Sequence, residues 1–313
     1  MIKEEFYFDS RDGENRIHAV RYTPDDGNVR GIVQIVHGMA EYVERYENLA
    51  EFLTKRGILV TGEDHLGHGK SVSEGGSFGY FCEQDPATVV VRDVHRLKKI
   101  TEEQYPQVPY IILGHSMGSF IARNYLCRYG SGIGGAVIVG TGMQPAGVIF
   151  ASKAMAGIQK LFCGSKHVSH FIDKAAFGGY NKRIDSPRTS SDWLSRNTEN
   201  VDRYIEDELC GFTFTVNGFQ TLFELIRRLQ KQENLDKVPQ NLPILMVSGA
   251  EDPVGDYGKG VRKACDSLKK AGVKNITVKL YENDRHELLN EEDGEQAMED
   301  IYQWIRREIP GLD

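Results

Sequence analysis

The 313-residue sequence lacks the features that mark several classes of protein. It has no run of about 18 apolar residues, which excludes a helix that spans a membrane. The N-terminal stretch alternates charged and apolar side chains and has no apolar core, so we expect no secretion signal. The net charge of −7 disfavours a general nucleic-acid binder, because neutralising phosphates requires clustered Lys and Arg. No internal repeat or low-complexity tract occurs.

Cysteine is sparse, and its spacing forms no motif. The five cysteines are Cys82, Cys127, Cys163, Cys210 and Cys265, with no Cys-x-x-Cys pair. An odd, scattered set indicates reduced thiols in a cytoplasmic protein, and it argues against a disulfide framework or a zinc site. The length suits one large domain, or one domain that carries an insertion.

Apolar runs that end in turn residues recur along the chain and predict strands. Nearly continuous runs lie at 31–38, 58–64, 110–116, 135–142 and 243–249, and such runs are typical of parallel strands covered on both faces. The segments 4–10 and 16–24 alternate as half-exposed strands do, and 275–282 is the final strand. Helical patterns lie at about 43–56, 86–104, 117–129, 257–271 and 294–308. The alternation predicts an α/β protein with a mostly parallel central sheet flanked by helices.

One segment, 144–235, interrupts this rhythm. It has no buried-strand run, whereas 150–162, 192–197 and 218–231 look helical. It holds 12 basic and 10 acidic residues, a net charge of +2, so the rest of the chain carries −9. We therefore predict a core formed by 1–143 and 236–313, with 144–235 inserted as a helical lid.

A serine between two glycines stands where a predicted strand meets a predicted helix. Gly114-His115-Ser116-Met117-Gly118 fits the G-x-S-x-G pattern of a nucleophile elbow, in which a strained turn projects the serine Oγ from the sheet edge. The glycines are needed because side chains there would collide with neighbouring backbone. In this strand–turn–helix context we interpret Ser116 as a nucleophile rather than a small residue in a turn.

A serine nucleophile needs a base and an acid. In proteins with a nucleophile elbow, both residues follow the serine along the chain, first Asp or Glu and then His. Downstream of Ser116 the histidines are His167 and His170, inside the predicted lid, and His286, after the last core strand. We therefore predict His286 as the base. Asp252, after the penultimate strand and stiffened by the next proline, is the predicted acid. Its competitors are Glu251, Asp256 and Asp284.

An oxyanion hole is the third requirement. One donor should be the backbone N–H that follows the nucleophile, that of Met117. The second should come from the loop after an early strand, where His37-Gly38-Met39 stands, and we predict the Met39 N–H.

With these residues placed, the sequence resembles the α/β-hydrolase fold, in particular its monoglyceride lipase and lysophospholipase-like branch. Four blocks carry the resemblance: HGMAEYVERY, DHLGHGKS, GHSMGS and RHELLNE, between positions 37 and 291. The resemblance implies a serine hydrolase with a Ser116–His286–Asp252 triad and no metal or other cofactor. Tyr42 departs from it, because the branch usually has histidine there. His65 and His68, which invite a metal interpretation, belong to a structural turn in this resemblance.

The substrate depends on the lid. Apolar lid residues are candidates to receive an acyl chain or to touch a membrane surface transiently; they include Val148, Ile149, Met155, Ile158, Leu161 and Phe162. Phe212, Phe214 and Phe219 are further candidates for the acyl pocket. Ordinary packing of a lid helix on the core explains the same residues.

We expect a serine esterase that cleaves monoacylglycerols, lysophospholipids or similar monoesters. One alternative is an aminopeptidase of the proline-iminopeptidase type, for which Glu206, Asp207 and Glu208 would hold a substrate ammonium. The other alternative is a non-catalytic binding protein on the same fold. The complete Ser–Asp–His set disfavours that alternative.

Overall fold

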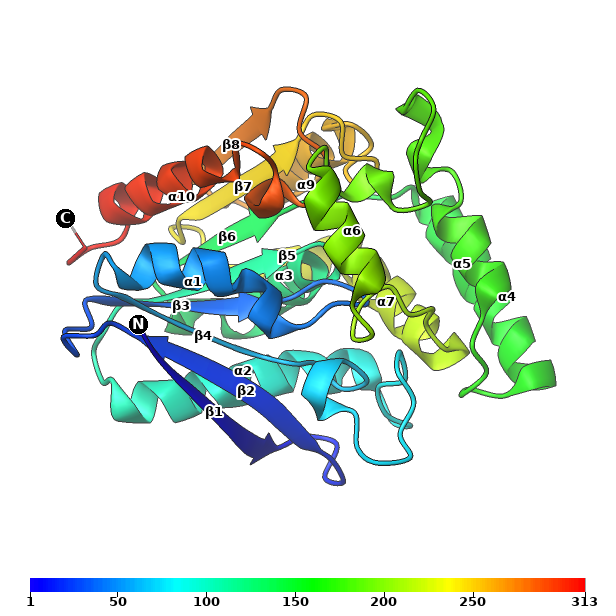
Figure 1. Cartoon of the computed structure of the whole chain (residues 1–313), viewed down its shortest axis with the longest axis horizontal. Helices are drawn as coiled ribbons and strands as arrows, with labels where there is room; N and C mark the ends of the chain where they lie inside the picture. The colour runs from blue at the N-terminus through cyan, green and yellow to red at the C-terminus, as the bar shows by residue number, and fades with distance from the viewer. Residues whose placement is uncertain (313) are drawn as a thin grey trace.

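The computed structural model describes residues 1–312, and it has one eight-stranded sheet in the order β1-β2-β4-β3-β5-β6-β7-β8 (Figure 1). The strands are β1 (Ile2–Asp9), β2 (Arg16–Thr23), β3 (Gly31–Val36), β4 (Ile58–Glu63), β5 (Tyr110–His115), β6 (Gly135–Val139), β7 (Ile244–Gly249) and β8 (Ile276–Tyr281). β2 pairs antiparallel with β1 and β4, and the remaining pairs are parallel. The predicted α/β architecture is confirmed.

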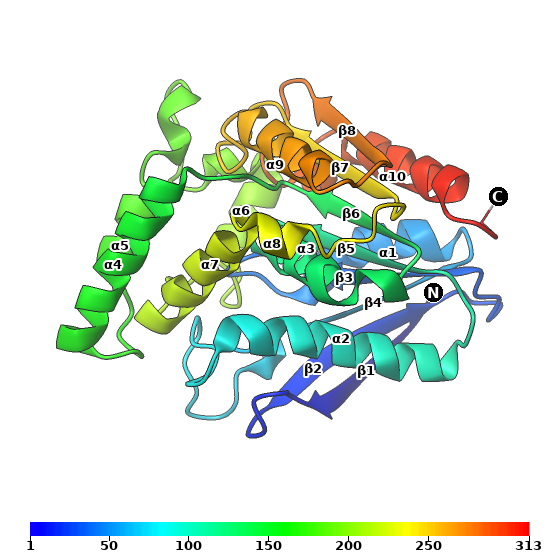
Figure 2. The same cartoon turned by 180° about the vertical axis from the view of Figure 1, so that it is seen from behind.

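Helices cover both faces of the sheet. α1 (Glu47–Thr54) and α10 (Gly294–Glu308) lie on the face turned to the viewer in Figure 1 and share one apolar core with it. α2 (Pro86–Gln104), α3 (Met117–Tyr129) and α9 (Lys259–Lys270) lie on the opposite face, shown in Figure 2, with a second core. Burial on both faces explains why the central strands read as unbroken apolar runs.

The alternation in β2 predicts a half-exposed strand, and this prediction is wrong. All positions of 17–22 are buried, because the two faces of β2 contribute to the two different cores. The polar members of the alternation are buried with partners instead of facing water. His18 Nδ1 lies 2.8 Å from Asp64 Oδ2, and Arg21 donates to Glu4 Oε2 at 3.1 Å.

The segment 144–235 contributes no strand to this sheet and lies at one end of the molecule, at the right in Figure 1. Its helices are α4 (Ala146–Cys163), α5 (His170–Phe177), α6 (Thr198–Glu206), α7 (Val216–Leu229) and α8 (Gln232–Leu235). The helical pattern at 192–197 is only the 3-10 turn Asp192–Leu194. The Asp192 carboxylate accepts hydrogen bonds from the backbone of Arg188 and Thr189, which favours a turn over a helix.

Short 3-10 helices complete the chain: Val43–Tyr46, Gly69–Ser71, Gly130–Gly132, Tyr180–Arg183, Asp192–Leu194 and Leu288–Asn290. Among residues 1–312, no helix combines the length and the apolar character that crossing a membrane requires.

Candidate active site

Ser116 occupies the turn between β5 and α3. Its φ of 54° and ψ of −121° are rare for a residue other than glycine, and such strain persists only where the surroundings enforce it. Ser116 caps α3, so the unpaired N–H groups of the first helical turn lie at the same end as its side chain. Their partial positive charge favours an anion at this point.

The two glycines of the elbow permit close backbone packing. A Cβ on Gly118 would lie 1.9 Å from the carbonyl oxygen of Val36, and a Cβ on Gly114 would lie 2.4 Å from that of Gly118. Distances this short exclude any side chain. The elbow therefore sits directly on the end of β3, where the predicted oxyanion segment begins.

Asp252 and His286 are paired in the loops that follow β7 and β8. His286 Nδ1 lies 3.0 Å from Asp252 Oδ2, and both residues are buried. Ser248 Oγ donates to the same carboxylate oxygen at 3.2 Å, and the Val254 N–H donates to Oδ1 at 2.8 Å. The carboxylate is therefore fixed by three hydrogen bonds, and it can hold the imidazole in one tautomer.

The competing residues lie elsewhere. Glu251 and Asp256 are exposed. Asp284 is buried but pairs with Arg196 at 2.6 Å, and burial raises the pKa of its carboxyl to about 6. His167 and His170 are exposed on the inserted segment.

The serine and histidine loops meet through His115 and Gly140. The rings of His115 and His286 have centroids 4.7 Å apart, and a Cβ on Gly140 would lie 3.1 Å from Cε1 of His286. Within residues 1–312, the imidazole of His286 makes one hydrogen bond, that to Asp252, and none to Ser116. The bond between nucleophile and base is often long or unformed before substrate binds.

The predicted oxyanion donors belong to two segments that meet at the serine. A Cβ on Gly38 would lie 3.1 Å from Ser116 Cβ, so the loop that carries Met39 touches the elbow. Met117 is the first residue of α3, and its N–H has no partner within the helix. Neither the Met39 nor the Met117 N–H donates a hydrogen bond to another group of residues 1–312. Both donors are thus available to a ligand.

A buried charge network, which the sequence does not predict, supports this loop. Glu41 Oε1 accepts a hydrogen bond from the Gly38 N–H at 2.5 Å and lies 3.3 Å from His115 Nδ1. Arg45 donates to Glu41 Oε2 at 2.9 Å. Burial alone would raise the pKa of Glu41, but the His115 hydrogen bond and the Arg45 charge lower it well below its usual range. No local pattern predicts this pair, because Glu41 precedes the 3-10 helix Val43–Tyr46 and Tyr42 between them is extended, with φ of −148° and ψ of 166°.

Aromatic side chains connect the inserted segment to His286. The ring centroid of Trp193 lies 5.1 Å from that of His286 and 4.9 Å from that of Tyr180. The Tyr180 centroid in turn lies 5.4 Å from that of Phe177. The ring centroids of Phe177 and Phe219 are 6.3 Å apart, which extends this row of aromatic side chains. Trp193 and Tyr180 were not predicted, because no local pattern shows that residues in this region approach a histidine about a hundred positions later.

The predicted pocket residues separate into three groups. Phe214 and Phe219 are fully buried, and Phe212 and Met155 are partly buried against the core. Ile158 is 59% exposed, which places it on the outer surface of α4 instead of in a buried pocket. The reason is that α4 buries only Ile149 and Ala156 in the core.

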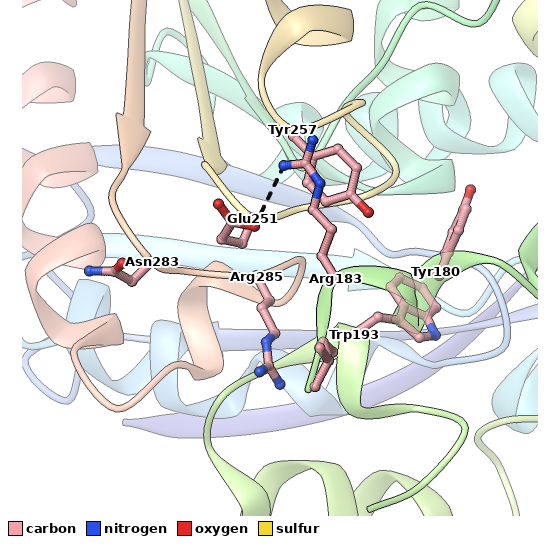
Figure 3. A pocket seen from close by; sticks show the side chains of 8 residues that line it. Tyr180, Arg183, Trp193, Glu251, Tyr257, Asn283 and Arg285 are labelled. Carbon is pink, nitrogen blue, oxygen red and sulfur yellow. Dashed lines mark ion pairs between the residues drawn. The ribbon is translucent and has the colours of Figure 1, made fainter. Parts of the chain in front are cut away.

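A pocket of about 110 Å³ lies beside the acid and histidine loops (Figure 3). Arg183 stacks on Tyr257 with 3.4 Å from Cζ to the ring centroid, and it lies 3.8 Å from Glu251. Arg285 points away from this pair in Figure 3 and donates to the carbonyls of Asp192 and Ser195. These contacts hold the inserted segment against both loops.

His37, His65 and His68 form a buried cluster of rings, and the ring centroids of His37 and His65 are 4.0 Å apart. Burial lowers the pKa of His68 to about 3, and it also lowers the pKa values of His37 and His65, so the rings are neutral. His37 Nε2 accepts the His65 N–H at 3.0 Å, which ties the two segments together. No group of three or more His, Cys, Asp or Glu within residues 1–312 is arranged to hold a metal ion.

The sequence matches the Hydrolase_4 family, described as serine aminopeptidase, S33, over residues 27–293, and the chain therefore belongs to this family. The monoglyceride lipase of Rattus norvegicus is 28% identical over 293 residues, which cover 92% of this chain and 86% of that protein. The monoacylglycerol lipase of Mycolicibacterium smegmatis is 28% identical over 285 residues, which cover 91% and 90% of the two chains.

The fold is shared with solved structures. A thermostable carboxyl esterase from Bacillus coagulans, solved in complex with glycerol, superposes with a TM-score of 0.91 at 31% identity and covers 98% of this chain and 99% of its own. The resemblance predicted from the four sequence blocks is confirmed. The protein is an α/β-hydrolase similar to monoglyceride lipases, and it is a serine ester hydrolase.

Proposed function

We propose that the protein hydrolyses monoacylglycerols, lysophospholipids or similar short-to-medium acyl monoesters. Ser116 is the nucleophile, His286 the base and Asp252 the acid that orients it. The observation that carries this proposal is the buried hydrogen bond of 3.0 Å between His286 and Asp252, next to a serine held in an elbow conformation.

The reaction follows from these positions. Ser116 Oγ attacks the ester carbonyl while His286 Nε2 takes its proton. The N–H groups of Met39 and Met117 stabilise the negative oxygen of the tetrahedral intermediate. His286 then returns the proton to the leaving alcohol, and the acyl group stays on Ser116. Water, deprotonated by the same imidazole, attacks the acyl-enzyme and releases the carboxylic acid.

The inserted segment 144–235 acts as a lid on the core 1–143 and 236–313, and it supplies the acyl pocket. Support comes from the aromatic contacts that run from Trp193 beside His286 to Phe219, and from there to Phe214 at 5.8 Å. Phe212 and Met155 continue this apolar lining. An acyl chain is the ligand that such a surface favours, because burying it removes apolar area from water.

The outer face of α4 makes transient contact with a lipid surface. Its apolar side chains are highly exposed: Val148 is 53% exposed, Phe150 77%, Ile158 59%, Leu161 84% and Phe162 85%. Exposed apolar patches of this kind on a helix that also carries lysines mark interfacial segments. On the basis of its scattered, unpaired cysteines, we also propose that the protein is cytoplasmic.

A serine aminopeptidase of the proline-iminopeptidase type is the alternative, and the description of the matched family favours it. That activity needs carboxylates that hold a substrate ammonium. Asp207 is already bonded to Tyr42 at 2.8 Å and to the Leu209 N–H at 2.9 Å, and Glu206 and Glu208 are exposed. The ester substrate is therefore the better supported one. A non-catalytic binding role is supported least, because no triad member is missing.

The test is one panel of monoacylglycerols, lysophospholipids, p-nitrophenyl esters and proline anilides, assayed with the wild type and Ser116→Ala. We expect ester hydrolysis by the wild type and a loss of about a thousand-fold or more in the variant. Ser267→Ala, on α9, is the matched control and should keep full activity. Equal rates for wild type and Ser116→Ala would refute the nucleophile, and preferential cleavage of proline anilides would favour the aminopeptidase.

A further inference from the structure

Tyr42 joins the predicted oxyanion segment 37–46 to the segment 144–235. Its hydroxyl donates a hydrogen bond of 2.8 Å to Asp207 Oδ2. Burial and this carboxylate raise the pKa of Tyr42, so the phenol remains a donor at physiological pH. The second oxygen of Asp207 accepts the Leu209 N–H at 2.9 Å, which fixes the carboxylate itself.

A second bond connects the same two segments. The Gly211 N–H donates to the carbonyl oxygen of Ala40 at 3.0 Å. Ala40 has a φ of 52°, in the left-handed region that residues with a Cβ avoid. Such a conformation persists only where neighbouring contacts hold it. On the outer side of the loop, two contacts hold it: the hydrogen bond from Gly211 to Ala40 and the hydrogen bond from Tyr42 to Asp207.

On the inner side, the Gly38 N–H is bound to Glu41 Oε1 at 2.5 Å. Hydrogen bonds therefore hold the chain on both sides of the Met39 amide. Glu41 holds Gly38 before it, and the segment 207–211 holds Ala40 and Tyr42 after it. A backbone donor stabilises an oxyanion only while it is aimed at the position where the charge develops. Loosening either point would let the Met39 N–H rotate away.

We propose that Tyr42 and Asp207 are a pair of positioning residues that hold the Met39 N–H in its oxyanion-binding orientation, so that the hole is complete only while the loop 207–211 is seated on 40–42. This inference rests on the proposed esterase function. It assigns to Asp207 a role in orienting the catalytic loop, in place of the substrate contact that the aminopeptidase alternative requires.

The test compares Tyr42→Phe, Asp207→Ala, Asp207→Asn and the double variant Tyr42→Phe/Asp207→Ala with the wild type. Tyr281→Phe is the matched control, because the hydroxyl of Tyr281, on β8, also donates a hydrogen bond of 2.8 Å to an aspartate, Asp300 on α10. We measure kcat and KM on a p-nitrophenyl ester, the affinity for a boronic acid that forms a tetrahedral adduct on the serine, and the thermal midpoint.

We expect Tyr42→Phe and Asp207→Ala each to lower kcat about ten-fold, with KM nearly unchanged and boronic-acid affinity lowered in parallel. The double variant should be no worse than Asp207→Ala alone, because Asp207→Ala already removes the bond to Tyr42 together with the bond to the Leu209 N–H. Asp207→Asn should stay close to the wild type, since its amide oxygen can accept the Leu209 N–H while its NH2 group donates to the Tyr42 hydroxyl oxygen. Tyr281→Phe and all thermal midpoints should be unchanged.

Two results overturn the inference. The first is that Tyr42→Phe and Asp207→Ala keep the wild-type kcat and the wild-type affinity for the boronic acid. If Ser116→Ala is inactive in the same assay, the proposed function stands and only the positioning role fails. The other is a loss of kcat that follows a fall in the thermal midpoint, with boronic-acid affinity unchanged, which shows a structural contribution only. If wild type and Ser116→Ala are equally inactive on esters, the proposed function itself fails.

Discussion

Arg45 and Glu287 form a bidentate ion pair, with Nη1 2.7 Å from Oε1 and Nη2 2.8 Å from Oε2. The pair links the segment 37–46, which carries the predicted oxyanion donor, to the residue that directly follows His286. Asn200 of the inserted segment donates to the same carboxylate at 2.6 Å, and the Tyr204 ring lies 4.9 Å from the Arg45 guanidinium. Burial would lower the pKa of Arg45, but the charge of Glu287 raises it, and the pair is held ionised beneath α6.

Arg45→Ala should destabilise the protein strongly. It leaves the carboxylates of Glu41 and Glu287 buried without their counter-ion, and removing one partner of a buried pair costs about 3–5 kcal/mol. Urea denaturation measures the change. The control is Lys55→Ala, which breaks the exposed pair with Glu51 and should shift stability by no more than about 0.5 kcal/mol. Similar small effects for both variants would contradict the buried role of Arg45.

Asp252→Asn should fold normally and lose about four orders of magnitude in kcat, because the amide no longer orients or stabilises the imidazolium. Circular dichroism and steady-state kinetics on one ester measure the two properties. Glu251→Gln, one residue earlier and exposed, is the control and should keep its rate. If Asp252→Asn is as active as the wild type, the acid lies elsewhere.

Gly118→Ala should prevent correct folding of the elbow. Its new Cβ would stand 1.9 Å from a backbone oxygen of β3, which cannot move without disturbing the sheet. We expect a much lower yield of folded protein and no activity. Gly147→Ala is the matched control, since nothing lies within 4 Å of its Cβ and alanine favours a helix by about 1 kcal/mol. A folded, active Gly118→Ala protein would show that the elbow is looser than its geometry indicates.

Leu161→Ser/Phe162→Ser should weaken binding to phospholipid vesicles while leaving hydrolysis of a water-soluble ester unchanged. The two side chains are 84% and 85% exposed on α4, so replacing them takes little apolar area out of the core. Vesicle sedimentation measures binding. Ile2→Ser, which replaces a 56% exposed residue on β1, is the control and should bind as the wild type does. Unchanged sedimentation of the double variant would argue against α4 as the contact surface.

Asp93 should make stability fall as the pH rises. Burial raises the pKa of its carboxyl to about 7, although the Ser10 hydroxyl and the Arg11 N–H donate to it. The unfolded chain ionises this group near its ordinary pKa, so the contribution to stability is lost between about pH 4 and about pH 7, by up to about 4 kcal/mol. Relative to the wild type, Asp93→Asn should become progressively more stable over that window. Parallel pH profiles of the thermal midpoint would contradict this.

Several elements were predictable because their signals are local. The helices 86–104, 117–129 and 294–308 have the bounds that their patterns predict, and each of the eight strands lies within or next to its apolar run. The elbow could be predicted for the same reason, since its glycines are required within five consecutive residues. The pairing of Asp252 with His286 followed from chain order and strand position, which place both at the carboxyl edge of one sheet.

The sequence by itself determined the layered fold, the elbow and the candidate triad, because periodicity and tight-turn chemistry act over a few neighbouring residues. The tertiary structure alone decided which residues of 144–235 face the core, why the polar side of β2 is buried, and how Arg45 meets Glu287 and Tyr42 meets Asp207. Those contacts join segments as many as 242 residues apart. Their partners are selected by packing of the whole chain and not by any local pattern.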